Sequence, residues 1–114
     1  MNSAFGFSQQ AEFSFDKSTQ RHKGKAKEGE IISFSYGFTN KGDAPLIISE
    51  YKVACPCTKV QFPTEPIPSG QHGTIKVTFD TKGKIGYQDR EIAIHSNAKD
   101  SPSHIRFKVM VDNK

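Results

Sequence analysis

The sequence has 114 residues, of which 34% are hydrophobic, and nine Phe and three Tyr supply large apolar side chains. This length suits one domain with one core, because a chain half as long would bury too little surface to fold unaided. Sixteen Lys and Arg against twelve Asp and Glu give a formal net charge of +4, which favours anionic surfaces without identifying one. No apolar stretch reaches the length of a membrane-spanning helix.

Residues 1–10 are mainly small, polar or aromatic, and they lack the charged start and continuous apolar region of an intact export signal. We interpret them as the remnant of a signal peptide or as a cloning leader, followed by one domain from residue 11 to residue 114. Because a signal peptide implies export, we expect the protein to be periplasmic or secreted.

Apolar and polar residues alternate with a period of two along most of the chain, which predicts strands with one buried face. The strongest segment places Ile32, Phe34, Tyr36 and Phe38 on one face. The charged segment 21–27 is interpreted as a solvated loop. No segment repeats apolar residues at helical spacing, so we predict little or no α-helix. In chain order, the seven expected strands cover residues 11–17, 31–39, 46–53, 58–62, 74–80, 88–96 and 104–112.

Turn residues separate these strands. Asn40-Lys41-Gly42-Asp43 is expected to supply a positive φ, and Pro63, Pro66 and Pro68 remove backbone donors from any ladder. Seven short strands with such turns predict an all-β fold, an immunoglobulin-like antiparallel β-sandwich. The chain has no Trp, and its two Cys are too close in sequence to form the inter-sheet disulfide of antibody domains.

Four short motifs follow one another in a fixed order: Lys27-Glu28-Gly29-Glu30, Asn40-Lys41-Gly42-Asp43, Ala54-Cys55-Pro56-Cys57-Thr58 and Pro66-Ile67-Pro68-Ser69-Gly70. In this order they resemble the motifs of a widespread bacterial family of unknown function, whose signature is a Ser-Cys-Gly-Cys-Thr segment. The resemblance spans about residues 24–111. It implies an immunoglobulin-like fold related to the major sperm protein and Hydin-type domains, commonly exported to the envelope of Bacteroidetes-like bacteria. It implies no established activity.

The chain departs from this family pattern at two positions of the cysteine segment. Ala54 stands where the family has Ser, and Pro56 stands where it has Gly. A role that requires a flexible or hydroxyl-bearing cysteine loop is therefore not expected here.

Cys55 and Cys57 form the one constellation with possible chemistry, because side chains at i and i+2 of an extended backbone point the same way. They could bind a thiophilic metal such as Cu(I), with His72 or His95 as further ligands, although a closed zinc site needs four ligands. A disulfide between them would close a very small ring, add little stability and be easy to reduce, hence redox-active. Alternatively, at least one thiol packs as a small apolar side chain.

No nucleophile elbow, catalytic triad spacing or phosphate-binding loop is present, and Asp80, Asp89, Glu91 and His95 are interpreted as solvent-facing strand residues. We therefore expect a non-catalytic module of the bacterial envelope that uses no cofactor. It would contact an unidentified protein or cell-surface polymer through strand edges and loops. We expect a monomer with no nucleic-acid partner. The alternative is a copper-binding or redox protein using Cys55 and Cys57, and a weaker third option is polyanion binding through residues 21–27.

Overall fold

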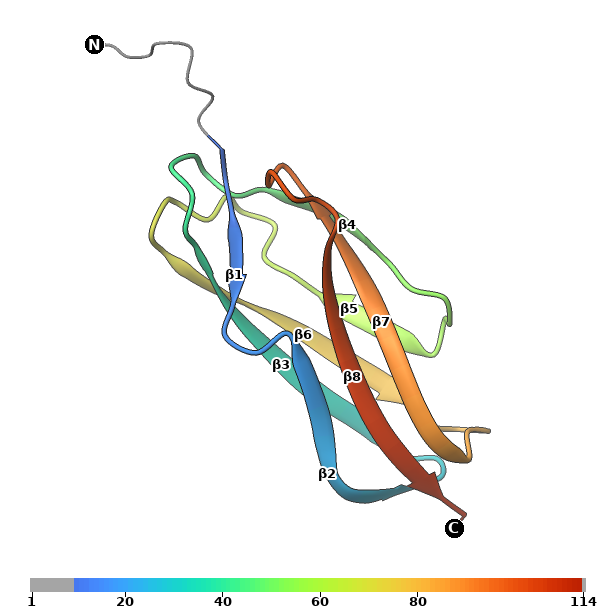
Figure 1. Ribbon diagram of the computed structural model, residues 1–114. Coiled ribbons are helices and arrows are strands. Elements are labelled where there is room, and N and C mark those ends of the chain that lie inside the picture. Colours follow the sequence, from blue (N-terminus) through green and yellow to red (C-terminus); the bar gives the residue numbers. More distant parts are fainter. Residues whose placement is uncertain (1–9, 114) are drawn as a thin grey trace, which may run out of the picture.

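The computed structural model describes residues 10–113 as two four-stranded sheets packed face to face (Figure 1). One sheet has the order β1-β3-β6-β5 and the other the order β2-β8-β7-β4. No helix occurs within this range. Residues 1–9 of the predicted leader lie outside the described residues, whereas Gln10, its last residue, is hydrogen-bonded to Asp43. The strands are β1 (Phe13–Phe15), β2 (Thr19–Lys27), β3 (Ile31–Asn40), β4 (Ile48–Lys52), β5 (Thr58–Gln61), β6 (His72–Asp80), β7 (Gly86–Ser96) and β8 (Ser103–Asp112).

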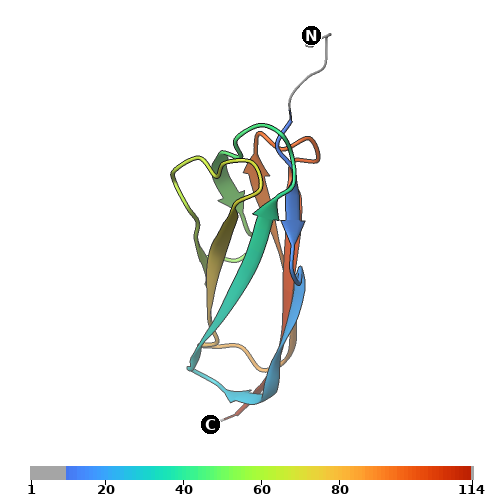
Figure 2. The same ribbon diagram turned by 90° about the vertical axis from the view of Figure 1, so that its left-hand side faces the viewer.

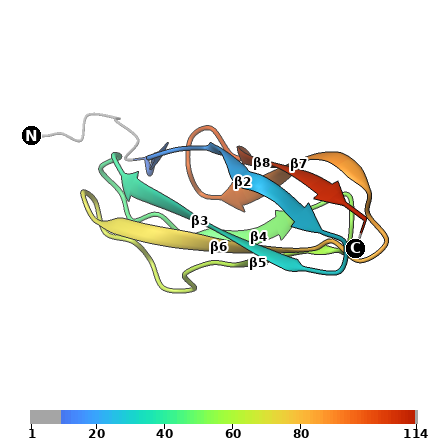
Figure 3. The ribbon, with the colours of Figure 1, turned by 90° about the horizontal axis from the view of Figure 1, so that it is seen from below.

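The core lies between the sheets, and the alternation read from the sequence builds it. Figure 3 shows β2, β8 and β7 in one layer and β3, β6 and β5 in the other. The predicted inner face of β3 is buried, and so are those of β6 and β8. The ring of Phe107 on β8 lies 4.9 Å from that of Phe34 and 5.0 Å from that of Phe79, centroid to centroid. These rings from both sheets provide apolar burial where an antibody domain has a disulfide.

The segment 21–27 is not the solvated loop that we expected. It belongs to β2, a strand additional to the seven that we expected. Strand β2 pairs in parallel with β8, so the sandwich is not antiparallel throughout. The physical reason is the position of β2 at a sheet edge, where only Ala26 is buried and most other side chains are polar. A register shift between Arg21 and Lys25, with Gly24 at φ 70°, also breaks the period of two.

The chain passes from one sheet to the other between β1 and β2, and hydrogen bonds fix this crossing. The Asp16 N–H donates to the Gly37 carbonyl (2.9 Å), and the Gln20 side chain donates to the Ser35 carbonyl (2.7 Å). Between the sheets, the hydroxyl of the fully buried Tyr36 donates to the backbone carbonyl of Arg106 (2.8 Å). These contacts join β1, β2 and β8 to β3.

Asn40 and Gly42 do not supply the positive φ that the sequence predicted. Asn40 is instead fully buried, and its side chain accepts hydrogen bonds from the Glu12 and Gly42 N–H groups and donates to the Ala44 and Ile67 carbonyls. Gly42 is needed because a Cβ at this position would collide with the backbone of Gln10 and Ala11. The turn at residues 40–43 is therefore a centre of packing and hydrogen bonding.

Three segments meet at the end of the sandwich that carries the C-terminus (Figures 1 and 2). The turn between β2 and β3 and the loop between β6 and β7 are joined by hydrogen bonds from Thr81 N to the Glu30 carbonyl (3.1 Å) and from Gly83 N to the Glu28 carboxylate (2.8 Å). The end of β8 joins them, because Glu28 N donates to the Asp112 carbonyl (2.8 Å). In the described part of the chain, no helix could cross a membrane.

Candidate functional site

The cysteine segment forms the crossover between β4 in one sheet and β5 in the other. Its backbone is held at both cysteines: Thr58 N donates to the Cys55 carbonyl (3.1 Å), and Asp80 N donates to the Cys57 carbonyl (2.9 Å). Pro56, between them, fixes its own φ and favours an extended conformation at Cys55. The segment is therefore anchored to β6 and has a restricted backbone.

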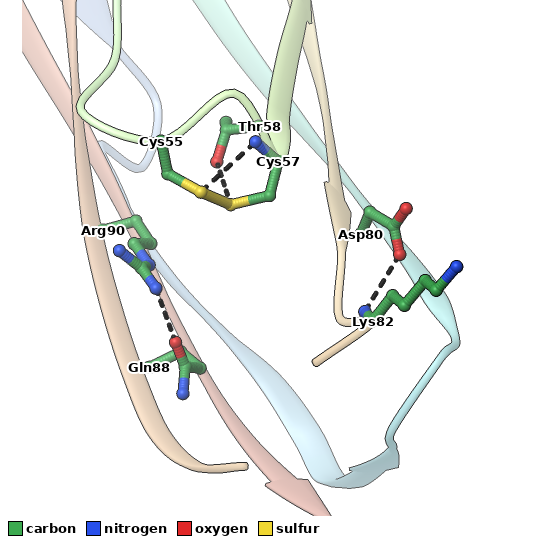
Figure 4. Close-up of a disulfide and its surroundings, with 7 residues drawn as sticks. All are labelled: Cys55, Cys57, Thr58, Asp80, Lys82, Gln88 and Arg90. Carbon is green, nitrogen blue, oxygen red and sulfur yellow. Dashed lines mark hydrogen bonds between the residues drawn. A yellow bond between two sulfur atoms is a disulfide. The ribbon is translucent and has the colours of Figure 1, made fainter. Parts of the chain in front are cut away.

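Cys55 and Cys57 are joined by a disulfide, with their Cα atoms 5.2 Å apart (Figure 4). The two side chains thus meet, as expected for i and i+2 positions. The Cys57 N–H also donates to Cys55 Sγ (3.2 Å), and the Thr58 hydroxyl lies 4.0 Å from Cys57 Sγ. Both cysteines are half-buried, and Cys57 packs against the core. The sulfurs are therefore held in place without being sealed from solvent.

The surface is hollowed on both sides of the disulfide. Cys55 lines a hollow of about 240 Å³ that includes Thr58 and the β7 residues Asp89, Arg90 and Glu91. Cys57 lines a separate hollow of about 160 Å³, formed with Pro56, the exposed Ile31 and Lys59 among others. The two cysteines thus border different environments: the Cys55 hollow includes Arg90 between two carboxylates, whereas the Cys57 hollow includes exposed Ile31 together with Lys59 and Asp80.

Arg90 is the unusual charged residue of this region. Its guanidinium lies 5.7 Å above the centre of the Phe79 ring and donates to the Gln88 side chain (2.7 Å; Figure 4). Its Nε is buried and has no hydrogen-bond partner among the described residues. The flanking carboxylates of Asp89 and Glu91 are paired instead with Arg106, at 2.7 and 3.2 Å. Arg90 thus brings a partly buried positive charge with no carboxylate partner to the Cys55 hollow.

The structure does not bring the two predicted histidine ligands to the cysteines. His72, at the start of β6, is hydrogen-bonded to Thr39. The backbone contact to Cys57 is made by Asp80 at the opposite end of the same strand, so His72 lies about 27 Å from Asp80. His95 lies on β7 opposite Glu50, four residues beyond Glu91 of the Cys55 hollow. Four residues of a strand span about 13 Å, so His95 is about that far from Glu91. Residues 10–113 contain no group of three or more His, Cys, Asp or Glu placed to hold a metal ion.

A second candidate site, which sequence reasoning missed, lies on the outer face of β7 and β8. Tyr87 and Met110 are cross-strand neighbours there, 51% and 39% exposed, and Ile85 just before β7 is 54% exposed. We call these three residues the β7–β8 patch. A signal was present in the sequence, because Met110 occupies the outward phase of an alternating strand where a polar residue is expected.

The fold and the anchored loop define the class of protein. Two packed sheets of mainly antiparallel strands, with the chain passing repeatedly from one sheet to the other, make this an immunoglobulin-like β-sandwich domain.

Within that class, the chain belongs to the family described as protein of unknown function (DUF1573), whose model matches residues 13–111. This confirms the resemblance seen in the sequence motifs. No curated protein matches the chain in sequence.

Several solved structures share the fold. A protein of unknown function from Porphyromonas gingivalis W83 superposes with a TM-score of 0.75 at 16% identity, over 90% of this chain and 47% of that one. The secreted serine protease VesC of Vibrio cholerae gives 0.62 at 14% identity, over 90% of this chain and 23% of that one. WR4, a major sperm protein family member of Caenorhabditis elegans, gives 0.54 at 11% identity, over 87% and 96%.

At these identities, the likeness concerns the fold alone. This chain spans about half the length of the Porphyromonas protein and about a quarter of the protease. The expected relation to the major sperm protein fold is confirmed.

Proposed function

We propose that this domain is a non-catalytic binding module of the bacterial envelope that contacts a protein partner through the β7–β8 patch. The observation that carries the proposal is the pairing of exposed Tyr87 and Met110 on one face, with exposed Ile85 just before the strand that carries Tyr87. Tyr and Met are enriched at protein interfaces, and exposed apolar side chains that cluster mark interaction sites more often than isolated ones do.

Lysines surround the patch, and their charges indicate the chemistry of the partner. Lys25 lies beside Met110 in the sheet register, Lys82 and Lys84 belong to the adjoining loop, and Lys108 precedes Met110 on the outer face of β8. The carboxylates at this end are largely occupied, since Asp112 pairs with Lys25, Asp89 pairs with Arg106, and Glu28 accepts a hydrogen bond from Gly83 N. Lys82, Lys84 and Lys108 form no ion pair among the described residues. An apolar surface with an acidic rim complements this arrangement.

The strand edges are weaker candidates than the patch. β1, β4 and β5 have three, five and four residues, and β2 carries Arg and Lys side chains together with a register shift. Short, charged and irregular edges are the devices by which proteins avoid pairing with another chain. This favours the sheet face over the edges for contact with a partner.

The disulfide and the comparisons support an envelope location. Disulfides persist in oxidising compartments such as the periplasm and the extracellular space. The same fold forms part of a secreted protein in Vibrio cholerae and of a protein from another bacterium, Porphyromonas gingivalis.

Binding by patch variants tests this proposal. The protein with Tyr87→Ala and Met110→Ala is compared with wild type for capture of partners from envelope extracts, at low and at high salt. A matched control carries Thr74→Ala and Lys76→Ala, on the outer face of the other sheet. We expect the patch variant to lose a captured protein that the control retains, and salt to weaken the wild-type complex. Equal capture by all three proteins would contradict the proposal.

A further inference from the structure

We propose that the Cys55–Cys57 disulfide exchanges with the thiols of a partner dithiol protein, through attack on Cys57 and departure of Cys55 beside Arg90. This activity is independent of the β7–β8 patch, which lies on the outer face of the other sheet from β5. It rests on three observations: the accessibility of the bond, the different surroundings of its two sulfurs, and the unpartnered charge of Arg90.

The Cys55–Cys57 disulfide differs from a buried structural disulfide because solvent can reach it. Both cysteines are half-buried, and each lines a hollow open to solvent. The bond joins residues only two positions apart, so it removes little conformational entropy from the unfolded chain. The centre of the core is formed by aromatic rings from both sheets, and Cys57 packs only against its margin. A bond that is solvent-accessible and adds little stability is suited to exchange.

The two hollows assign the direction of attack. The hollow at Cys57 is bordered by exposed Ile31 and Pro56 and by the polar residues Lys59, Thr78 and Asp80. Its apolar side chains can receive the residues that flank a partner's cysteine, while the charges of Lys59 and Asp80 are of opposite sign. The Cys55 hollow contains none of the exposed large hydrophobic side chains of the described residues, and its carboxylates, Asp89 and Glu91, are already paired with Arg106. It therefore offers less apolar surface to the residues around a partner's cysteine.

Cys55 is equipped as the leaving group. Its Sγ already accepts a hydrogen bond from the Cys57 N–H (3.2 Å), which would strengthen when the sulfur becomes a thiolate. Arg90 lines the same hollow with a buried Nε that has no hydrogen-bond partner in the described part of the chain. A buried donor without a partner requires an explanation, and a thiolate on Cys55 would supply a negative charge at this position.

The exchange balances as a two-electron transfer. A thiolate of the partner forms a bond to Cys57 Sγ while the Cys55–Cys57 bond breaks, and Cys55 leaves with the electron pair. The partner is now joined to Cys57 by a mixed disulfide. The partner's second thiol loses its proton to solvent and attacks the partner's own sulfur in that mixed disulfide. Cys57 then leaves as a thiolate that solvent protonates. The partner's two thiols are oxidised to a disulfide, and this chain is reduced to a dithiol.

The test uses reduced glutathione as the probe on the folded, oxidised protein at neutral pH. A sample quenched early with acid is analysed by tandem mass spectrometry to locate the first glutathione adduct. We expect the adduct on Cys57 and full reduction without unfolding. An adduct on Cys55 would overturn the assigned direction, and reduction only after denaturation in urea would overturn exchange itself.

The part played by Arg90 is tested by the rate of reduction. We expect Arg90→Gln to slow reduction on the order of tenfold, because the departing thiolate loses its cation, and Arg90→Lys to restore most of the rate. A thermal melt of each variant controls for misfolding. Equal rates in wild type and Arg90→Gln, with both proteins folded, would refute the role of Arg90.

Discussion

The substitution Asn40→Ala is expected to be among the most destabilising single changes of a polar residue in the domain. The Asn40 side chain has no exposed surface and makes four hydrogen bonds to backbone groups of the Glu12, Gly42, Ala44 and Ile67 residues, at 2.8 to 3.1 Å. Alanine would leave those groups without this partner. At about 1 kcal/mol for each lost bond, the cost is about 3–5 kcal/mol.

Denaturation in urea measures this cost. For a domain of this size, the loss corresponds to a fall in melting temperature of about 12–20 °C, with an unchanged m-value in urea. The matched control is Asn97→Ala, because exposed Asn97 also bonds to two backbone groups, Ile47 N (2.8 Å) and the Pro45 carbonyl (2.9 Å). Water can replace those bonds, so we expect a cost of about 1 kcal/mol or less. A similar loss in both variants would refute the reasoning from burial.

Two further changes test the packing between the sheets and at the turn. Burial raises the pKa of the Tyr36 phenol, so the folded state holds this proton more tightly than the unfolded state does. The stability that this buried proton contributes should be fully present below the unfolded pKa of about 10 and should be lost as the pH rises above it. Tyr36→Phe should cost about 1 kcal/mol near pH 7, and urea titrations of this variant should show a smaller loss of stability at alkaline pH. Gly42→Ala should cost about 1–3 kcal/mol in the same assay, because its Cβ would collide with the Gln10 backbone, whereas tolerance would show that this segment can move aside.

The fold followed from the sequence wherever a strand buries one complete face. Strand β3 shows this best, since its even-numbered positions from Ile32 to Phe38 are apolar and buried. Strand β2 could not be found in the same way, because an edge strand with Ala26 as its only buried residue has almost no apolar alternation. Its pairing with β8 is a property of the tertiary arrangement, which the local pattern does not encode.

The candidate sites divide in a similar way. That the Cys55 and Cys57 side chains meet followed from their spacing, because the i and i+2 side chains of an extended segment point to the same face. Arg90 was not identified, since its approach to the disulfide depends on packing between β7 and the crossover loop. The turn at Asn40-Lys41-Gly42-Asp43 was misread because Asn and Gly are the residues that most often adopt a positive φ in turns, whereas here burial selects Asn40 and close backbone approach selects Gly42.

Photocrosslinking in the native organism tests the binding proposal most directly. A photoreactive phenylalanine replaces Tyr87 in one strain and Thr74, on the outer face of the other sheet, in a second strain. The account predicts a discrete adduct with an envelope protein from position 87, lost when Met110→Ser is added and absent from position 74. Equal adducts from both positions, or none from position 87, would contradict it.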